Sequence, residues 1–454
     1  MNRIASRAMI VLALVLVLLS GTVFFVAEYA FEGSDWVMTA GSPHVYRDDR
    51  VGKGVVTDGN DVLLLDTTNG KTFSKDPDIR KAYLHWVGDR EGNVQAGILS
   101  FYGKELVGYD ALSGTYRYGD AAGQMVLSID STVQTAALKA MGNRKGTVAV
   151  YNYKTGEIIC AISTPAFDPN NPPDVTNDTT GAYEGVYVNR FLRSKYIPGS
   201  IFKIVTLAAA LECIPEIQNQ TFTCTGSISL GGGDVTCERS HGTQSLKDAF
   251  CNSCNCAFAQ ITLQVGKERM VRYVEQFGLT QSLSFDGLTT VSGNYSVEKA
   301  CEQEFAWSGI GQYTDQVNPC AYMQFMGAIA GGGVTSSPHV VREIKLGGRS
   351  TYSANQAESV RIMSVSTAKI LSEYMQNNVS AKYGSDNFPG MTVCAKSGTG
   401  EVGGDKRPNA MFSGFVSDPD MPLAFIVCIE EGGYGAQTCI PVLSAVLAAC
   451  KASS

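Results

Sequence analysis

An uncharged apolar run near the N-terminus most constrains what this chain can fold into. No charged residue occurs from position 8 to 27, and Arg3, Arg7 and Glu28 flank the run. Twenty helical residues at about 1.5 Å each span about 30 Å, which is the hydrocarbon thickness of a bilayer. Because basic residues favour the cytoplasmic side, we expect a single-pass membrane protein with a cytoplasmic tail at 1–7, a transmembrane anchor at 8–27 and an extracellular remainder.

The alternative for this run is a cleaved signal peptide. Such a peptide has a shorter apolar stretch, followed by a small-x-small cleavage site. Here the run is longer, and "FFVAEYA" at 24–30 offers no clean site. The uncleaved anchor is therefore the preferred interpretation.

The rest of the chain has the composition of a globular protein. Of its 454 residues, 44% are hydrophobic and 17% are charged, and the formal net charge is -7. A negative chain without basic clusters argues against a nucleic-acid partner. Thirteen cysteines, an odd number, look mostly like small core residues, although Cys224 and Cys237 flank a glycine-rich stretch and are candidates for closing a hairpin. The spacing of "CNSCNC" at 251–256 and His241 fits no ordinary zinc finger, so we expect no metal site and no cofactor.

Changes in hydrophobic period suggest the domain organisation. Residues 34–120 have the pattern of short strands and turns, with a hairpin at "GVVTDGNDVLLLD". After a strand that ends at Asp130, Ser131 and Gln134 are expected to form the capping box of a helix. We place the domain boundary just before this strand, between a small N-terminal domain at 28–122 and a second domain at 123–454.

The second domain has strands at both of its ends. "GTVAVYNYKTGEIICAIS" predicts a hairpin, and "MTVCAKSG", "NAMFSGFV" and "LAFIVCIE" predict three later strands before an apolar C-terminal helix. The stretch 200–330 between them is mostly helical. Early and late strands around a helical middle predict an antiparallel sheet with helices packed on it.

The stretch "YIPGSIFKIVTLAAALE" at 196–212 places a lysine in the first turn of an apolar helix. Ser200 and Lys203 are three residues apart and so share one face. Burial lowers the pKa of a lysine, and a neutral amine can accept a proton from the serine. Ser200 and Lys203 are therefore a candidate nucleophile and base.

Ser-x-x-Lys is an unspecific pattern, and "SVEK" at 296–299 and "STAK" at 366–369 also match it. Only "SIFK" opens a long apolar helix after Pro-Gly. Two further segments provide the polar groups that such a site needs, namely "SCN" with Ser253 and Asn255, and "KSGT" from Lys396 to Thr399. "KTG" at 154–156 and "SDN" at 385–387 are interpreted as a hairpin turn and a loop.

Taken together, "SIFK", "SCN" and "KSG" resemble the motifs of the penicillin-binding and serine β-lactamase superfamily. "LSIDSTVQ", "YIPGSIFK", "HGTQSLKDAFCNSCNCAFAQ", "GIGQ" and "AKSGTGE" are similar to class B penicillin-binding proteins over residues 123 to 450. The resemblance implies an α+β fold. Its expected parts are a five-stranded antiparallel sheet flanked by helices, an all-helical subdomain, an N-terminal transmembrane helix and a small β-rich pre-domain.

The resemblance also implies a peptidoglycan D,D-transpeptidase. Ser200 would attack the penultimate D-alanine of a stem peptide with Lys203 as base, and Ser253 and Asn255 would bridge and position. Lys396, Ser397 and Thr399 would hold the substrate carboxylate, with Gly398 allowing a close backbone approach. The backbone N–H groups of Ser200 and Thr399 would stabilise the oxyanion.

Binding of β-lactams at Ser200, and a polytopic glycan polymerase as partner, follow from the same resemblance. Cys254 in the second motif and Ser397 in the third depart from the commonest pattern, and the N-terminal domain is short. D,D-carboxypeptidase activity, a β-lactamase, a β-lactam sensor and a non-catalytic scaffold remain alternatives. A glutamate that activates water in the "ExxLN" manner is not found, which disfavours the β-lactamase.

Overall fold

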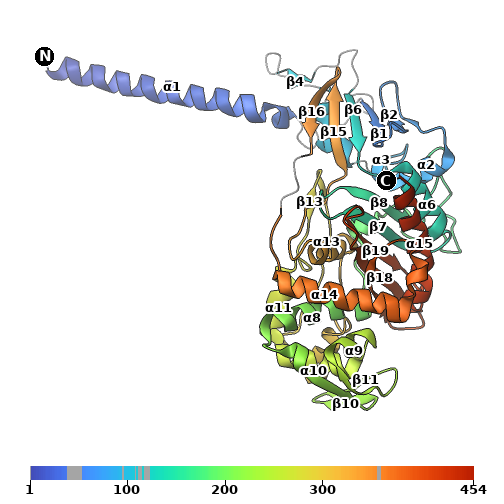
Figure 1. Cartoon of the computed structure of the whole chain (residues 1–454). Helices are drawn as coiled ribbons and strands as arrows, with labels where there is room; N and C mark the ends of the chain where they lie inside the picture. The colour runs from blue at the N-terminus through green and yellow to red at the C-terminus, as the bar shows by residue number, and fades with distance from the viewer. Residues whose placement is uncertain are drawn as a thin grey trace.

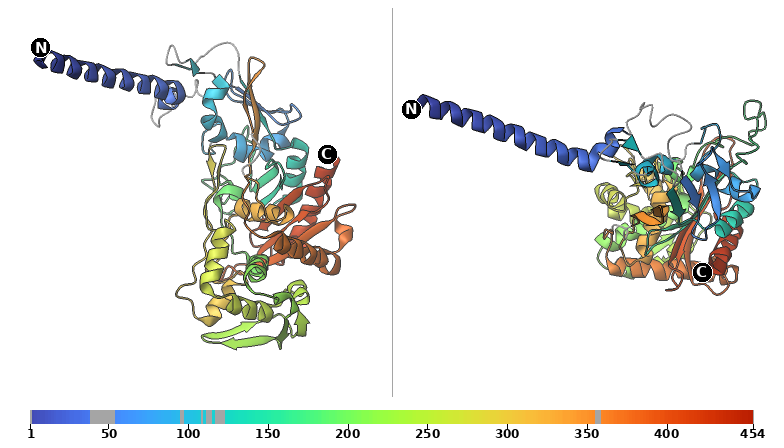
Figure 2. Two further views of the ribbon diagram at one scale, coloured as in Figure 1. Left: turned by 60° about the vertical axis from the view of Figure 1, so that its left-hand side comes forward. Right: turned by 90° about the horizontal axis from the view of Figure 1, so that it is seen from above.

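Figure 1 shows the computed structural model, which describes residues 2–37, 54–94, 97–107, 109–110, 115–116, 123–354 and 359–453. Helix α1 (Asn2–Val37) extends away from the body of the molecule in every view (Figures 1 and 2). The most apolar window of its segment Ile4–Gly33 has a mean hydropathy of 2.9 and is not buried against the rest of the chain. A helix this long and apolar suits a bilayer, so the expected apolar helix is confirmed.

The main sheet consists of five antiparallel strands in the order β17-β18-β19-β7-β8. These strands are β7 (Gly146–Asn152), β8 (Ile158–Thr164), β17 (Val393–Gly400), β18 (Asn409–Val416) and β19 (Leu423–Ile429). Every residue of strands β18 and β19 is buried, which explains why their sequences are mostly apolar rather than alternating. The two polar exceptions are Asn409 and Ser413 of β18. The predicted sheet, built from early and late segments, is confirmed, and β17 lies at its edge.

Helices cover both faces of the main sheet. Helices α6 (Ser131–Met141) and α15 (Gly435–Ser453) pack together on one face, and α13 (Pro319–Ala330) packs on the other. Helix α14 (Val365–Asn378) packs against the edge strand β17. α15 is apolar enough to span a membrane, but 44% of its most apolar window is buried, as expected for a core helix.

The N-terminal cap of α6 differs from the predicted capping box. The cap is Asp130, whose carboxylate accepts a hydrogen bond of 3.0 Å from the Val133 N–H. Ser131 lies inside the helix, and the side chain of Gln134 instead donates to the carbonyl oxygens of Ala82 and Ala161. The expected Ser131–Gln134 box was therefore wrong by one position, because the carboxylate of Asp130 already serves as the cap.

A second, upper sheet has the order β16-β15-β6-β1-β2-β3. Its strands are β1 (Gly54–Thr57), β2 (Leu63–Asp66), β3 (Thr72–Phe73), β6 (Gly123–Leu127), β15 (Val341–Leu346) and β16 (Arg349–Ser353). The predicted hairpin of β1 and β2 is confirmed. β6, β15 and β16 follow residue 122 in the sequence, so this sheet combines strands from both sides of the expected domain boundary.

Short elements complete the N-terminal part and the connections. They are α2 (Pro77–Ala82), α3 (Leu84–Val87), α4 (Gly97–Phe101), α5 (Gly103–Val107), β4 (Tyr109–Asp110), β5 (Thr115–Tyr116), α7 (Arg190–Arg193), β13 (Ser284–Phe285), β14 (Leu288–Thr289), η3 (Val379–Tyr383) and η4 (Ser385–Asn387). The decoy "SDN" thus forms the single turn η4.

The lower lobe, residues 199–276 and 302–308, is helical with small paired strands. Its helices are η1 (Gly199–Phe202), α8 (Lys203–Cys213), η2 (Ile217–Asn219), α9 (Leu246–Cys251), α10 (Asn255–Val265), α11 (Lys267–Gln276) and α12 (Glu302–Ser308). Its strands are β9 (Thr221–Cys224), β10 (Ser227–Leu230), β11 (Gly233–Thr236) and β12 (Gly242–Ser245). Two antiparallel pairs, β9 with β12 and β10 with β11, are thus added to the subdomain expected to be all-helical. The glycine-rich turn between β10 and β11 makes the second pair possible.

Candidate active site

Ser200 lies in the tight turn η1, just before α8 and against the edge strand β17. The preceding Gly199 has a φ of +54°, and a Cβ at this position would collide with the carbonyl oxygen of Thr399. Its N–H donates to the carbonyl oxygen of Gly311 over 2.8 Å. Only glycine fits this conformation and this space, so Pro198-Gly199 brings Ser200 directly beside the third motif.

Lys203 begins α8 and has no exposed surface. Its Nζ lies 3.1 Å from Ser200 Oγ, 3.0 Å from Ser253 Oγ and 2.7 Å from Asn255 Oδ1. It also contacts the Ser253 carbonyl oxygen at 2.5 Å. One buried amine therefore joins the first motif to the second, as the sequence predicts.

Ser253 connects the two lysines. Its hydroxyl lies 3.0 Å from Lys203 Nζ and 3.1 Å from Lys396 Nζ. The residue has a φ of +52°, a left-handed conformation that is unfavourable for a side chain other than glycine. Strained backbone of this kind concentrates at functional sites, where surrounding contacts hold it. At the start of α10, Asn255 Nδ2 donates to the Thr236 carbonyl oxygen over 2.8 Å.

Strand β17 contributes the third motif. Lys396 is 1% exposed, and its Nζ lies 3.0 Å from the Ser397 carbonyl oxygen. The Thr399 carbonyl oxygen accepts a 3.3 Å bond from the side chain of Gln312. At Gly398 the close backbone approach is made by the chain itself, since a Cβ there would meet the Pro198 carbonyl oxygen. This glycine therefore allows η1 to pack against β17.

Burial controls the protonation of both lysines. It is the largest cause that moves the pKa of Lys203 well below its usual value, and the nearby charge of Lys396 lowers it further. Burial likewise lowers the pKa of Lys396 to about 7. A neutral Lys203 next to a hydroxyl can act as a general base, which is what the apolar helix of the sequence predicts.

The three motifs open onto one cleft of about 900 Å³. Ser200, Ser253, Asn255, Ser397, Gly398 and Thr399 line it, while the two lysines lie beneath. The remaining lining residues are Thr236, Cys237, Glu238, His241, Asn252, Trp307, Ile310, Gln312, Glu401, Tyr434, Gly435, Ala436 and Gln437. Among the residues that the structure describes, this lining includes no member of "SVEK", "STAK", "KTG" or "SDN".

The structure adds two residues that lie outside "SIFK", "SCN" and "KSGT". Tyr383 OH lies 3.0 Å from Ser397 Oγ and accepts a 3.0 Å bond from the Ser397 N–H, so it orients the third motif. Gln312, the last residue of "GIGQ", bonds to Thr399 as described above. "GIGQ" was a usable signal for Gln312, whereas Tyr383 precedes a decoy motif and reaches Ser397 only through the fold.

Known proteins resemble this chain in sequence and in fold. A family profile, the penicillin-binding protein transpeptidase domain, matches residues 146–448. The peptidoglycan D,D-transpeptidase PbpA of Mycolicibacterium smegmatis is 28% identical over 338 residues, which cover 68% of each chain. The stage V sporulation protein D of Bacillus subtilis is 27% identical over 68% of this chain and 49% of its own.

Solved structures share the fold. Penicillin-binding protein A of M. tuberculosis, in its ceftriaxone acyl-enzyme complex, superposes with a TM-score of 0.76 at 24% identity, covering 87% of this chain and 98% of that one. The D,D-transpeptidase domain of a peptidoglycan glycosyltransferase from Eggerthella lenta gives a TM-score of 0.75 at 22% identity, over 88% and 98% of the two chains. The α+β architecture expected from the sequence is thereby confirmed.

Proposed function

This chain belongs to the penicillin-binding protein transpeptidase family, and on that premise we propose that Ser200 is the nucleophile of a peptidoglycan D,D-transpeptidase. The enzyme is a serine-type transpeptidase of class B, and β-lactams bind to it. One observation carries the assignment of the site. Lys203 Nζ lies 3.1 Å from Ser200 Oγ, and the Ser253 hydroxyl lies within 3.1 Å of both buried amines.

Acylation follows from this arrangement. Ser200 Oγ attacks the carbonyl carbon of the penultimate D-alanine, and its proton moves to the neutral amine of Lys203. The tetrahedral oxyanion is stabilised by the N–H groups of Ser200 and Thr399, a contribution typically worth about 10²–10³ in rate per donor. The C–N bond then breaks, and the proton passes through Ser253 Oγ to the leaving D-alanine. This gives an ester on Ser200 and free D-alanine.

Deacylation reverses the proton path. An amine from a neighbouring stem peptide attacks the ester carbonyl and loses its proton through Ser253 to Lys203 or back to Ser200 Oγ. A new amide bond forms, and Ser200 regains its hydroxyl. Water in place of the amine gives the D,D-carboxypeptidase side reaction.

The third motif holds the substrate. The hydroxyls of Ser397 and Thr399 bind the terminal carboxylate, and the amine of Lys396 attracts it electrostatically from beneath the cleft. The free edge of β17 pairs with the extended stem peptide, because an edge strand presents unpaired backbone groups. The same groups receive the carboxylate of a β-lactam, whose ring opens when Ser200 attacks.

The orientation in the membrane and the partner belong to this proposal. Arg3 and Arg7 keep the N-terminus in the cytoplasm, so the cleft faces the outside of the cell. Residues 28–122 form a non-catalytic region and residues 123–454 the transpeptidase region, and the upper sheet joins them. Helix α1 and the upper sheet are the surfaces offered to a polytopic glycan polymerase, a partner that the class B resemblance supports.

Labelling with a fluorescent penicillin tests the proposed nucleophile. The native chain should take up one label, and mass spectrometry should place it on the peptide that contains Ser200. The Ser200→Ala variant should remain unlabelled while keeping its melting temperature. Label on another residue, or on the variant, would refute the assignment. A stable label also separates a transpeptidase from a β-lactamase, which would hydrolyse a chromogenic cephalosporin at more than about 1 s⁻¹.

A further inference from the structure

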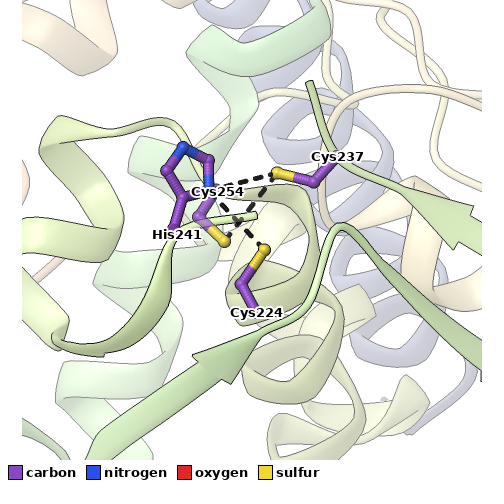
Figure 3. A group of neighbouring side chains, drawn as sticks. All are labelled: Cys224, Cys237, His241 and Cys254. Atoms are coloured by element: carbon purple, nitrogen blue, oxygen red, sulfur yellow. Dashed lines mark hydrogen bonds between the residues drawn. The ribbon is translucent and has the colours of Figure 1, made fainter. Parts of the chain in front are cut away.

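Three thiols and an imidazole converge beside the second motif (Figure 3). They come from the end of β9, the residue after β11, the residue before β12 and the N-terminal cap of α10. We call them the thiolate cluster: Cys224, Cys237, His241 and Cys254. One ligand atom from each lies within 4.8 Å of all the others.

Three distances between ligand atoms of the thiolate cluster are close to the edge lengths of a tetrahedral zinc site. His241 Nδ1 lies 3.5 Å from the Sγ atoms of both Cys224 and Cys237. The Sγ atoms of Cys237 and Cys254 are 3.9 Å apart. With Zn–S bonds of about 2.3 Å and Zn–N bonds of about 2.0–2.1 Å, a tetrahedral site has edges of about 3.6–3.8 Å. The four atoms therefore need only small movements to bind one central ion.

Backbone N–H groups already point at two of the sulfurs. The Asn255 N–H donates to Cys237 Sγ over 3.3 Å, and the Ala257 N–H donates to Cys254 Sγ over 3.4 Å. Both donors lie in the first turn of α10, where the helix dipole favours negative charge. All thirteen cysteines are free thiols in the structure, so the ligands are available.

We propose that the thiolate cluster binds one Zn²⁺ ion as a closed structural site. Binding forms three Zn–S bonds and one Zn–N bond and releases three thiol protons to solvent, which leaves one net negative charge at the α10 N-terminus. Four protein ligands fill the tetrahedron, so no position remains for water or substrate. The ion therefore holds the site in position and takes no part in the reaction.

The ion acts on the second motif through the chain itself. Cys254 lies between Ser253 and Asn255, the two residues of the second motif that contact Lys203. Cys237 follows Thr236, whose carbonyl oxygen accepts the bond from Asn255. Bound zinc thus fixes both ends of that bond and restrains the left-handed backbone at Ser253. The ion therefore orients Ser253 and Asn255, which form the proton relay with Lys203. Outer-shell groups orient metal ligands in a comparable way.

The sequence spacing predicts no metal here, and the reason is visible in the fold. The intervals between the four ligands are thirteen, four and thirteen residues. Ordinary zinc fingers place their ligands in two close pairs, whereas here the strand pairs β9–β12 and β10–β11 bring together ligands that are far apart in sequence. Of the cysteines in "CNSCNC", only Cys254 takes part.

Metal analysis of the full chain tests the proposal without relying on its activity. The protein, purified in detergent under anaerobic reducing conditions, should contain one zinc ion per chain. Cobalt should replace zinc and give the visible absorption of a tetrahedral thiolate site. Cys237→Ser and His241→Ala should each lose the ion, while Cys213→Ser, a partly exposed cysteine outside the cluster, should keep it.

Removal and return of zinc test the positioning role. A chelator should lower the melting temperature of the native chain and slow its acylation by fluorescent penicillin by about 10–100-fold. Added zinc should restore both, and it should restore neither in the Cys237→Ser variant. A native chain without zinc that gives no cobalt spectrum, or that carries a Cys237–Cys254 disulfide, would overturn the proposal. Zinc content unchanged in both cluster variants would overturn it as well. Because metal content is read separately from labelling, failure of the zinc site leaves the assignment of Ser200 standing.

Discussion

The buried amine of Lys203 makes acylation depend on pH in a defined direction. Its pKa lies well below the usual 10.5 because the site excludes water and Lys396 is nearby. Only the neutral amine accepts a proton, so the rate of acylation by penicillin should rise with pH and level off well below pH 10.5. Stopped-flow labelling from about pH 5 to about pH 9 measures this limb.

Two variants make the pH test specific. Lys203→Arg keeps a positive charge at every pH, so acylation should fall by about 10²–10⁴ and lose its rising limb. Lys369→Arg changes the exposed lysine of the decoy "STAK" on α14 and should leave the profile unchanged. A rate independent of pH in the native enzyme would contradict the role of Lys203.

Lys396 should reduce stability at low pH. Its pKa is about 7 in the folded chain against 10.5 for an ordinary lysine. Between these values the unfolded chain binds more protons, so the free energy of unfolding rises with pH by up to about 1.4 kcal/mol per unit. Below about pH 7 the folded chain carries the full cost of the buried charge.

Lys396→Met removes this titration. Its melting temperature relative to that of the native chain should therefore be highest near pH 6 and fall toward about pH 9, as measured by calorimetry, while penicillin labelling is lost. A difference in melting temperature that stays constant with pH would show that Lys396 is not buried as a titrating amine.

At the same scale, the sequence identifies residues that belong to a motif and misses those that only the fold brings close. Ser200 and Lys203 could be predicted because helical spacing places them on one face. Tyr383 contacts Ser397 from fourteen residues away, through a turn with no recognisable pattern. The ligands of the thiolate cluster are likewise separated in sequence, by the β10–β11 hairpin and by β12 with α9.

At the scale of elements, the contact between η1 and β17 should control the rate. Gly199→Ala would place a methyl group against the Thr399 carbonyl oxygen and strain a φ of +54°. Ser200 would then shift relative to β17, and a displacement of about 1 Å costs about 10²-fold in rate. Labelling kinetics measure this loss.

Gly347→Ala is the matched control, since Gly347 has a φ of +57° but no atom within 4 Å of the added methyl group. It should lose a similar amount of stability through backbone strain and retain its acylation rate. Equal rates in the two variants would show that the packing of η1 on β17 is unimportant for catalysis.

The elements themselves were predictable where period and length are clear. The five strands of the main sheet and the apolar helices follow from local pattern. The upper sheet could not be foreseen, because β6 pairs with β1 in parallel and with the distant β15 on its other side. Pairing over such sequence distances depends on tertiary packing, which local propensity does not report.

At the scale of the whole molecule, α1 should act as an anchor that the cleft does not need. Its apolar segment Ile4–Gly33 has no buried surface in its most apolar window, and thirty helical residues span about 45 Å, more than a bilayer core. A chain beginning after Val37 should therefore stay in the aqueous phase of a Triton X-114 separation, whereas the full chain should enter the detergent phase. Its rate of penicillin labelling should match that of the full chain within about twofold, because the buried site is remote from α1.

A chain in which an unrelated apolar helix replaces α1 is the control. It should bind the membrane again, but it should not present the α1 surface that we propose for the glycan polymerase. A truncated chain that aggregates or loses labelling would show instead that α1 stabilises the body of the enzyme.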